Sequence, residues 1–105
     1  MDTPENIYDL PEKLNKEYTE ILHQSKHTIV EQIISKGHTT EEGKWLIQEH
    51  AEWVMIVQGH AKLEIEDHKF TLHQGDNILI EGSKRHRVTE TSKIPECIWL
   101  AVHFK

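Results

Sequence analysis

The sequence predicts an all-β domain of barrel or sandwich type, preceded by a short amphipathic helix. Short runs of β-branched and aromatic residues recur from residue 28 onward, as they do in strands. Turn-forming residues separate these runs about every 8–12 residues, a spacing typical of all-β domains rather than of βαβ units. The stretch 61–66 alternates between apolar and charged residues, which indicates a strand with one buried and one solvated face.

The first expected element is a helix within residues 1–26. Apolar residues recur there at spacings of three and four, at Leu10, Leu14, Tyr18, Ile21 and Leu22. Charged residues fill the positions between them, which is the pattern of an amphipathic helix. The polar stretch 23–27 ends this pattern. We therefore expect residues 1–26 to form a helical segment that packs on a barrel formed by residues 27–105.

The strands of the barrel are expected where the apolar runs lie. These runs cover residues 28–30, 33–34, 45–47, 53–57, 61–65, 70–72, 78–80, 86–90 and 97–102. Residues 66–69 are expected to form a hairpin turn, and residues 74–77 form another, in which Gly75 is free to take a positive φ. The pattern amounts to about eight short strands in one domain, since no Gly-, Pro- or Ser-rich linker divides the chain.

Composition narrows the functions that need to be considered. The 105 residues carry a net charge of −6, which disfavours a protein that binds nucleic acid by neutralising phosphates. The one cysteine excludes an intramolecular disulfide, as expected in a reducing compartment. No apolar run approaches the ~18 residues of a membrane span. We therefore expect a cytoplasmic protein without a membrane or nucleic-acid partner.

Two motifs carry a resemblance to a known family. Residues 52–59 begin with Glu and end with Gly, and an alternating strand and the turn Gly75-Asp76 follow. Residues 80–86 run from an apolar strand end to a histidine. This pattern resembles the two cupin motifs, over residues 43–104, and is similar to a group of small bacterial single-cupin proteins without a settled activity. The resemblance implies a double-stranded β-helix, a jelly-roll barrel, that assembles as a homodimer.

The match to the cupin motifs is incomplete. Carried over position by position, the two histidines of the first motif fall at Leu46 and Gln48, and only Glu52 and His86 are retained. The Pro and Gly of the second motif are replaced by Glu81 and Ser83. The resemblance therefore implies a reduced set of site residues.

The expected ligand-binding residues are Gln48, His50, Glu52 and His86. Gln48, His50 and Glu52 would share one face if the chain stayed extended, because residues two apart in a strand point the same way. The family geometry projects Glu52 and His86 into the barrel mouth, where they could hold Mn, Fe or Zn with Gln48 as a neutral third ligand. The alternative is a hydrogen-bonded pair of Glu52 and His86 with no ion.

Other polar residues have two interpretations each. Arg85 and Arg87 could meet an anionic group of a ligand, or point away from His86 toward solvent and acidic neighbours such as Glu90. His103 alternates with apolar positions of the last strand and could reach the barrel interior or a dimer surface. Cys97 opens an apolar strand and is expected to be a packing residue, because nothing near it in the sequence would lower its pKa.

Three classes of function remain open. The first is a cupin that binds a small molecule in its barrel, with a weakly held divalent metal. The second is a metal-dependent enzyme of oxygenase or isomerase type, and the third is a non-catalytic regulatory or partner-binding module. The run 53–57 is apolar on both faces, and a strand buried on both faces needs a second covering layer, either the N-terminal helix or a partner subunit. We therefore expect a homodimer.

Overall fold

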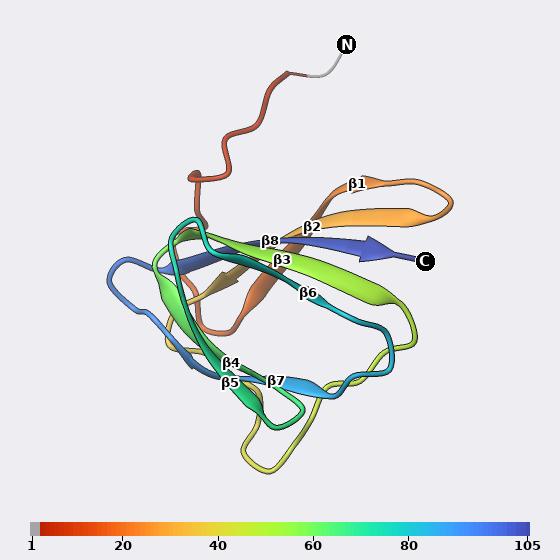
Figure 1. Ribbon diagram of the computed structural model, residues 1–105. Helices are drawn as coiled ribbons and strands as arrows, with labels where there is room; N and C mark the ends of the chain where they lie inside the picture. Colours follow the sequence, from red (N-terminus) through yellow and green to blue (C-terminus); the bar gives the residue numbers. More distant parts are fainter. Residues whose placement is uncertain (1–2) are drawn as a thin grey trace.

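The protein is a small β-barrel with an extended N-terminal segment (Figure 1). The computed structural model describes residues 3–105. Its strands are β1 (Tyr18–Gln24), β2 (Thr28–Ser35), β3 (Ala51–Gln58), β4 (His60–Ile65), β5 (His68–His73), β6 (Asn77–Ile80), β7 (His86–Thr91) and β8 (Cys97–Phe104). They form a five-stranded sheet in the order β1-β2-β8-β3-β6 and a three-stranded sheet in the order β5-β4-β7. All strand pairs are antiparallel. The predicted all-β fold is confirmed.

The core lies between the two sheets and follows from the period-two pattern of the strands. Alternate residues of β3, β4 and β8 point inward, and the residues between them point outward. The buried core consists of Val54, Ile56, Ala61, Leu63, Leu72, Ile80, Cys97, Trp99 and Ala101. Cys97 is a packing residue, as predicted, with no exposed surface. Apolar side chains of both sheets therefore fill the space between them.

The predicted N-terminal helix is wrong. Among residues 3–105 there is no helix; residues 1 and 2, where the predicted segment starts, lie outside the described residues. Residues 18–24 instead pair with β2 as an antiparallel edge strand, and every residue of this strand is exposed. The apolar spacing was compatible with a helix, but β2 offers an unpaired strand edge, and pairing with it satisfies the backbone hydrogen bonds of both segments. Farther upstream the segment contacts the same sheet, where Gln32 Nε2 donates to the Ile7 carbonyl over 2.6 Å.

The predicted strand at residues 45–47 is also wrong. These residues belong to a long connection, residues 36–50, between β2 and β3. Only Leu46 forms a bridge, and it pairs with His86 at the start of β7 through two backbone hydrogen bonds of 2.7 and 2.8 Å. The connection thus runs along the barrel and is anchored beside a predicted site residue.

The other turns agree with the sequence. Residues 66–67 connect β4 to β5, and Gly75, with a φ of 91°, lies in the turn between β5 and β6. The described residues contain no helix that is long and apolar enough to cross a membrane.

Candidate functional site

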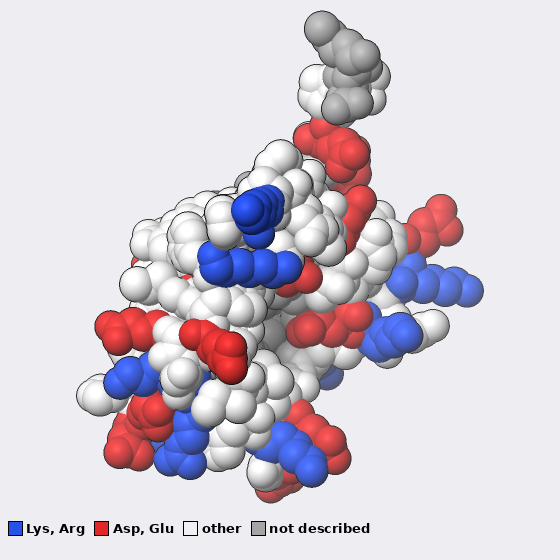
Figure 2. Space-filling view, turned by 90° about the vertical axis from the view of Figure 1, so that its right-hand side faces the viewer, with Lys and Arg blue, Asp and Glu red and all other residues white. Residues whose placement is uncertain are grey.

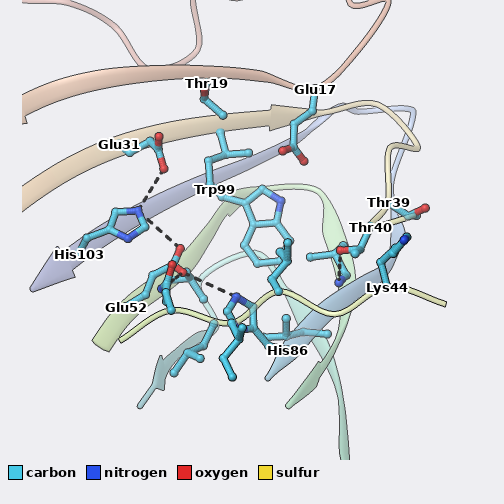
Figure 3. A pocket seen from close by; sticks show the side chains of 18 of the residues that line it. Glu17, Thr19, Glu31, Thr39, Thr40, Lys44, Glu52, His86, Trp99 and His103 are labelled. Atoms are coloured by element: carbon cyan, nitrogen blue, oxygen red, sulfur yellow. Dashed lines mark hydrogen bonds and ion pairs between the residues drawn. The ribbon is translucent and has the colours of Figure 1, made fainter. Parts of the chain in front are cut away.

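A cavity of about 590 Å³ opens between the two sheets (Figure 3). Its apolar wall includes Val54 from β3, Leu63 from β4 and Trp99 from β8. Its polar groups come from β1 and the residue before it, from β2, β3, β7 and β8, and from the connection 36–50, so residues far apart in the sequence meet there. A cavity with an apolar wall and a few convergent polar groups is the usual form of a small-molecule site.

Three of the four predicted ligand-binding residues line this cavity. Glu52 is 7% exposed and His86 is 5% exposed. Gln48 Nε2 donates a hydrogen bond of 2.9 Å to Glu52 Oε1, and His86 Nε2 lies 3.9 Å from the same oxygen. The separation between the imidazole and the carboxylate exceeds hydrogen-bond distance. The two buried groups therefore face each other without a direct hydrogen bond.

The proton position of His86 follows from its other nitrogen. His86 Nδ1 lies 3.3 Å from the Lys84 carbonyl oxygen. A carbonyl oxygen only accepts hydrogen bonds, so we assign the proton of the neutral ring to Nδ1. His86 Nε2 then presents a lone pair toward Glu52. Among the described residues no fully buried side-chain nitrogen or oxygen lacks a hydrogen-bond partner, so this unpaired Nε2 is open to the cavity.

A second imidazole lies on the other side of Glu52. His103 Nε2 is 3.1 Å from Glu31 Oε1 and 3.8 Å from Glu52 Oε2. A carboxylate accepts, so Nε2 of His103 carries the proton and donates to Glu31. Glu52 and His103 are directly opposite each other in the register of β3 and β8. The carboxylate of Glu52 thus lies between a hydrogen-bond-accepting imidazole and a hydrogen-bond-donating one.

Sequence reasoning did not include Glu31 in the site. A usable signal was the alternation in β2, where Glu31 shares its inward face with Ile33 and Ser35. For His103, which alternates with Val102 and Phe104, the sequence left two locations open, and the structure places it in the barrel interior, on the same face of β8 as Trp99 and Ala101.

The far part of the cavity is hydroxyl-rich. Glu17, Thr19, Thr39, Thr40 and Lys44 line the cavity, and in Figure 3 Trp99 lies between Thr39, Thr40 and Lys44 on one side and the His103–Glu52 group on the other. Ser35 Oγ donates a hydrogen bond of 3.0 Å to Glu17 Oε2 and so fixes the position of this carboxylate.

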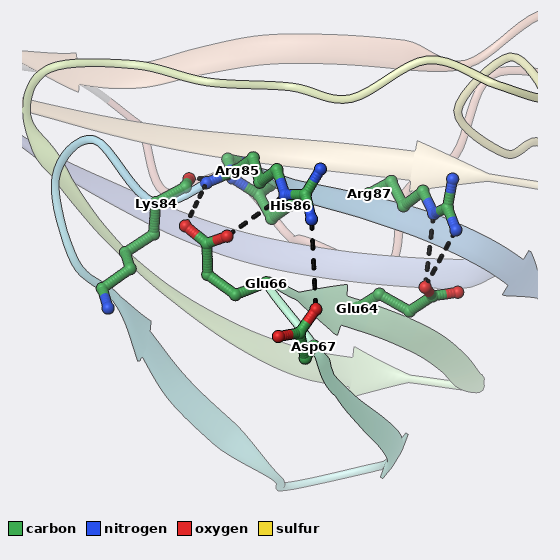
Figure 4. Close-up of polar contacts among 7 residues, drawn as sticks. All are labelled: Glu64, Glu66, Asp67, Lys84, Arg85, His86 and Arg87. Atoms are coloured by element: carbon green, nitrogen blue, oxygen red, sulfur yellow. Dashed lines mark hydrogen bonds and ion pairs between the residues drawn. The ribbon is translucent and has the colours of Figure 1, made fainter.

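Trp45 of the connection 36–50 stacks against two arginines, Arg85 and Arg87, which flank His86 at the start of β7. Figure 4 shows the ion pairs that hold these arginines in place. Above the Trp45 ring, the guanidinium carbon of Arg87 lies at 4.0 Å and that of Arg85 at 4.4 Å. Arg87 pairs with Glu64 at 3.0 Å and Arg85 with Glu66 at 3.1 Å. The arginines point away from His86 toward acidic neighbours, but these are Glu64 and Glu66 rather than Glu90. Neither arginine lines the cavity.

Gly82 brings the two motif segments close together. A Cβ at this position would lie under 3.0 Å from the Glu49 carbonyl oxygen. Next to it, Ser83 N donates a hydrogen bond of 2.7 Å to the Gln48 carbonyl. The β6–β7 turn can therefore approach the segment that carries Gln48 only because residue 82 has no side chain.

His50, the fourth predicted ligand-binding residue, does not line the cavity. It is half-buried, and the edge of its ring meets His103 with the ring centroids 5.5 Å apart. This ring contact with His103 connects it to the site.

The donor set does not fit the divalent metal that the resemblance implies. His86 Nε2 and the carboxylate of Glu52 are suitable donors, but Gln48 presents its N–H groups to Glu52 rather than its carbonyl oxygen. Within residues 3–105, no three His, Cys, Asp or Glu side chains form a group that could hold a metal ion. Sites for Mn, Fe or Zn usually offer three or more protein ligands.

Comparison with known proteins agrees with the fold. A family model described as "Cupin domain" matches residues 31–103. A protein from Ralstonia eutropha JMP134, named as a candidate mannose-6-phosphate isomerase, is 31% identical, with 99% of each chain covered and a TM-score of 0.92. No curated protein matches the sequence.

More distant solved structures share the fold alone. A cupin superfamily protein from Desulfitobacterium hafniense DCB-2 has a TM-score of 0.75 at 18% identity, covering 90% of this chain and 83% of its own. The protein TT1209 from Thermus thermophilus has a TM-score of 0.76 at 13% identity, covering 90% and 89%. From the family match and the Ralstonia relative, the chain belongs to the cupin domain family, and its barrel is a jelly roll.

Proposed function

We propose that this protein binds a small molecule in the barrel cavity through Gln48, Glu52 and His86. The observation that carries the proposal is the unpaired Nε2 of His86, which belongs to a 5% exposed residue and opens into the cavity beside the carboxylate of Glu52. Because this nitrogen is accessible from the cavity and has no partner in the protein, it is free to accept a hydrogen bond from a bound molecule. A ligand with a matching donor would do so.

Ligand-observed NMR with a chemically mixed fragment set tests this proposal. Several fragments are expected to bind the wild type with millimolar or better affinity and to lose binding in His86→Ala and Glu52→Ala. His68→Ala is the matched control, since His68 is exposed on β5. Fragments that bind all four proteins equally would show that the cavity is not the site.

The divalent metal expected from the resemblance is not part of this proposal, because the donor set falls short. Metal analysis of protein purified without a histidine tag, before and after reconstitution with Mn, Fe and Zn, measures this directly. Stoichiometric metal in the wild type that is lost in His86→Ala would contradict the conclusion that these residues do not hold a metal ion.

A second candidate is a proton-transferring enzyme of isomerase type. The observation that favours it is the pairing of one accepting and one donating imidazole on the two sides of Glu52, because such reactions need a base and an acid on one wall of the site. The name of the Ralstonia relative points to the same class. Incubation of D-mannose in D₂O is then expected to exchange its C2 proton, and His86→Gln to abolish this exchange. Equal exchange with and without the wild-type protein would reject this candidate.

We further propose that the protein is a cytoplasmic homodimer that associates through the outer face of the five-stranded sheet. Trp53, Met55, Leu100 and Val102 share that face and are half-buried, and Leu79, opposite Trp53, is 50% exposed. A second copy would cover this apolar surface. The third class of function, a partner-binding module, would use the same face.

A further inference from the structure

The charged groups that line the cavity are mostly acidic. Four carboxylates, those of Glu17, Glu31, Glu41 and Glu52, face one lysine, Lys44. Two histidines, His86 and His103, complete the set, and the carboxylates outnumber the cations even if both rings are protonated. Figure 2 shows one face of the molecule hollowed near its centre, with Asp and Glu side chains on either side of the hollow. The cavity therefore favours a cation over an anion.

The buried part of the cavity presents hydrogen-bond acceptors that lack donors. His86 Nε2 carries a lone pair, because its Nδ1 proton is directed at the Lys84 carbonyl. Glu52 Oε2 lies 3.8 Å from His103 Nε2, beyond hydrogen-bond distance. These two acceptors belong to residues that are each more than nine-tenths buried. A ligand that satisfies them must donate hydrogen bonds, and an ammonium group offers three donors and no acceptor.

We propose that the ligand is a small hydroxylated molecule with a protonated amine, whose ammonium group donates to Glu52 and His86. This inference rests on the proposed function of small-molecule binding and names the class of ligand. Trp99, 4% exposed, forms the wall between the two ends of the cavity, and an indole face or edge there excludes water from the ion pair. The hydroxyl groups of the ligand meet Thr39 and Thr40 at the far end; because Thr40 Oγ1 already accepts from Val88 N at 3.0 Å, its hydroxyl proton is free to donate to the ligand.

The same arrangement rejects a phosphorylated ligand. Arginine is the side chain best suited to bind phosphate, but Arg85 and Arg87 lie outside the cavity, stacked on Trp45 and paired with Glu66 and Glu64. Lys44, on the exposed connection, is the one lysine in the lining. A phosphate placed near Glu52 would leave two anions facing each other in a partly buried site, which is unfavourable.

Three matched probes test the charge preference. D-glucamine, D-sorbitol and D-sorbitol 6-phosphate share a six-carbon polyol chain and carry a positive, a neutral and a negative charge at neutral pH. Isothermal titration calorimetry with the full chain is expected to show that glucamine binds about tenfold or more tightly than sorbitol, since a charge-assisted hydrogen bond is worth about 1.5–3 kcal/mol. Sorbitol 6-phosphate is expected to bind more weakly than sorbitol.

Variants separate the buried carboxylate from general charge effects. Glu52→Gln keeps the shape of the side chain and removes its charge, so the preference for glucamine over sorbitol is expected to fall to about threefold or less. Glu31→Gln is expected to weaken it less, because Glu31 already accepts from His103. Glu66→Gln is the matched control, since Glu66 pairs with Arg85 outside the cavity. A preference that persists in Glu52→Gln would overturn the assignment of the ammonium to that carboxylate.

The remaining outcomes are also decisive. Sorbitol 6-phosphate binding as tightly as glucamine, or equal binding of the three probes, would overturn the inference. If none of the probes binds but the mixed fragments do, the inference fails and small-molecule binding stands. If neither the probes nor the fragments bind, both proposals fail.

Discussion

Gly82 offers a sharp test of how the two motif segments are held together. In Gly82→Ala the new Cβ would lie under 3.0 Å from the Glu49 carbonyl oxygen and 3.1 Å from its carbon. Backbone atoms cannot rotate away as the end of a flexible side chain can, so the β6–β7 turn has to separate from residues 48–49. Gly43→Ala is the matched control, because its Cβ would meet nothing within 4 Å and only its φ of 81° is unfavourable for alanine.

The expected magnitudes differ between the two variants. Forcing extra atoms into a packed site costs typically about 1–3 kcal/mol, and loss of the Ser83–Gln48 hydrogen bond adds about 1 kcal/mol. We expect Gly82→Ala to lower the free energy of unfolding by about 3 kcal/mol. Gly43→Ala should lower it by about 1 kcal/mol, the cost of a left-handed conformation for a residue with a Cβ.

Thermal and urea unfolding measure the difference, and the NMR signals of the His86 ring report on the site. A domain of this size loses roughly 4–8 °C in Tm per kcal/mol, so Gly82→Ala should lower Tm by at least about 12 °C. The His86 signals should shift in Gly82→Ala and stay in place in Gly43→Ala. Equal losses of stability in the two variants, with unmoved His86 signals, would refute the argument that this close approach holds the site.

Three further predictions concern other parts of the molecule. Trp45→Ala removes two cation–π contacts, with Arg85 and Arg87, and should lower the free energy of unfolding by about 1–2 kcal/mol; an unchanged urea midpoint would contradict this. Burial, and then the nearby charge of Glu17, raises the pKa of the Cys97 thiol to about 12. Cys97 should therefore react with a thiol reagent only after unfolding, and its contribution to stability, fully present below about pH 9, should be lost as pH rises toward 12. Met55→Lys, on the outer sheet face, should convert a dimer into a monomer in sedimentation at micromolar concentration, and a wild type that is already monomeric would remove the basis for this prediction.

The local alternation of apolar and polar residues was sufficient to predict most of the strands, and the motifs were sufficient to predict part of the candidate site. The alternation in residues 61–66 predicts β4, because the two faces of a strand alternate residue by residue whatever the rest of the chain does. The resemblance to the cupin motifs predicted Glu52 and His86 as site residues, and both line the cavity, as does His103, which the motifs do not include.

The errors occurred where pairing between distant segments decides the structure. Residues 18–24 fit a helical spacing, yet they form β1 because the edge of β2 was available to them. Residues 45–47 have strand-like composition, but Trp45 stacks under two arginines, and Leu46 makes one bridge to His86. The propensity of a short segment is a weak preference that such contacts override.

The sequence by itself determined an acidic all-β domain and the inward and outward faces of its strands, and its resemblance to the cupin motifs predicted Glu52 and His86 as candidate site residues. Only the tertiary structure decided that Glu31 and His103, 72 residues apart, would pair and that His103 would lie beside Glu52. It also decided that both arginines of the basic cluster would lie outside the cavity. The physical reason is that side-chain alternation is local to each strand, whereas the register between strands, and therefore the charge of the cavity, is set by backbone pairing across the whole chain.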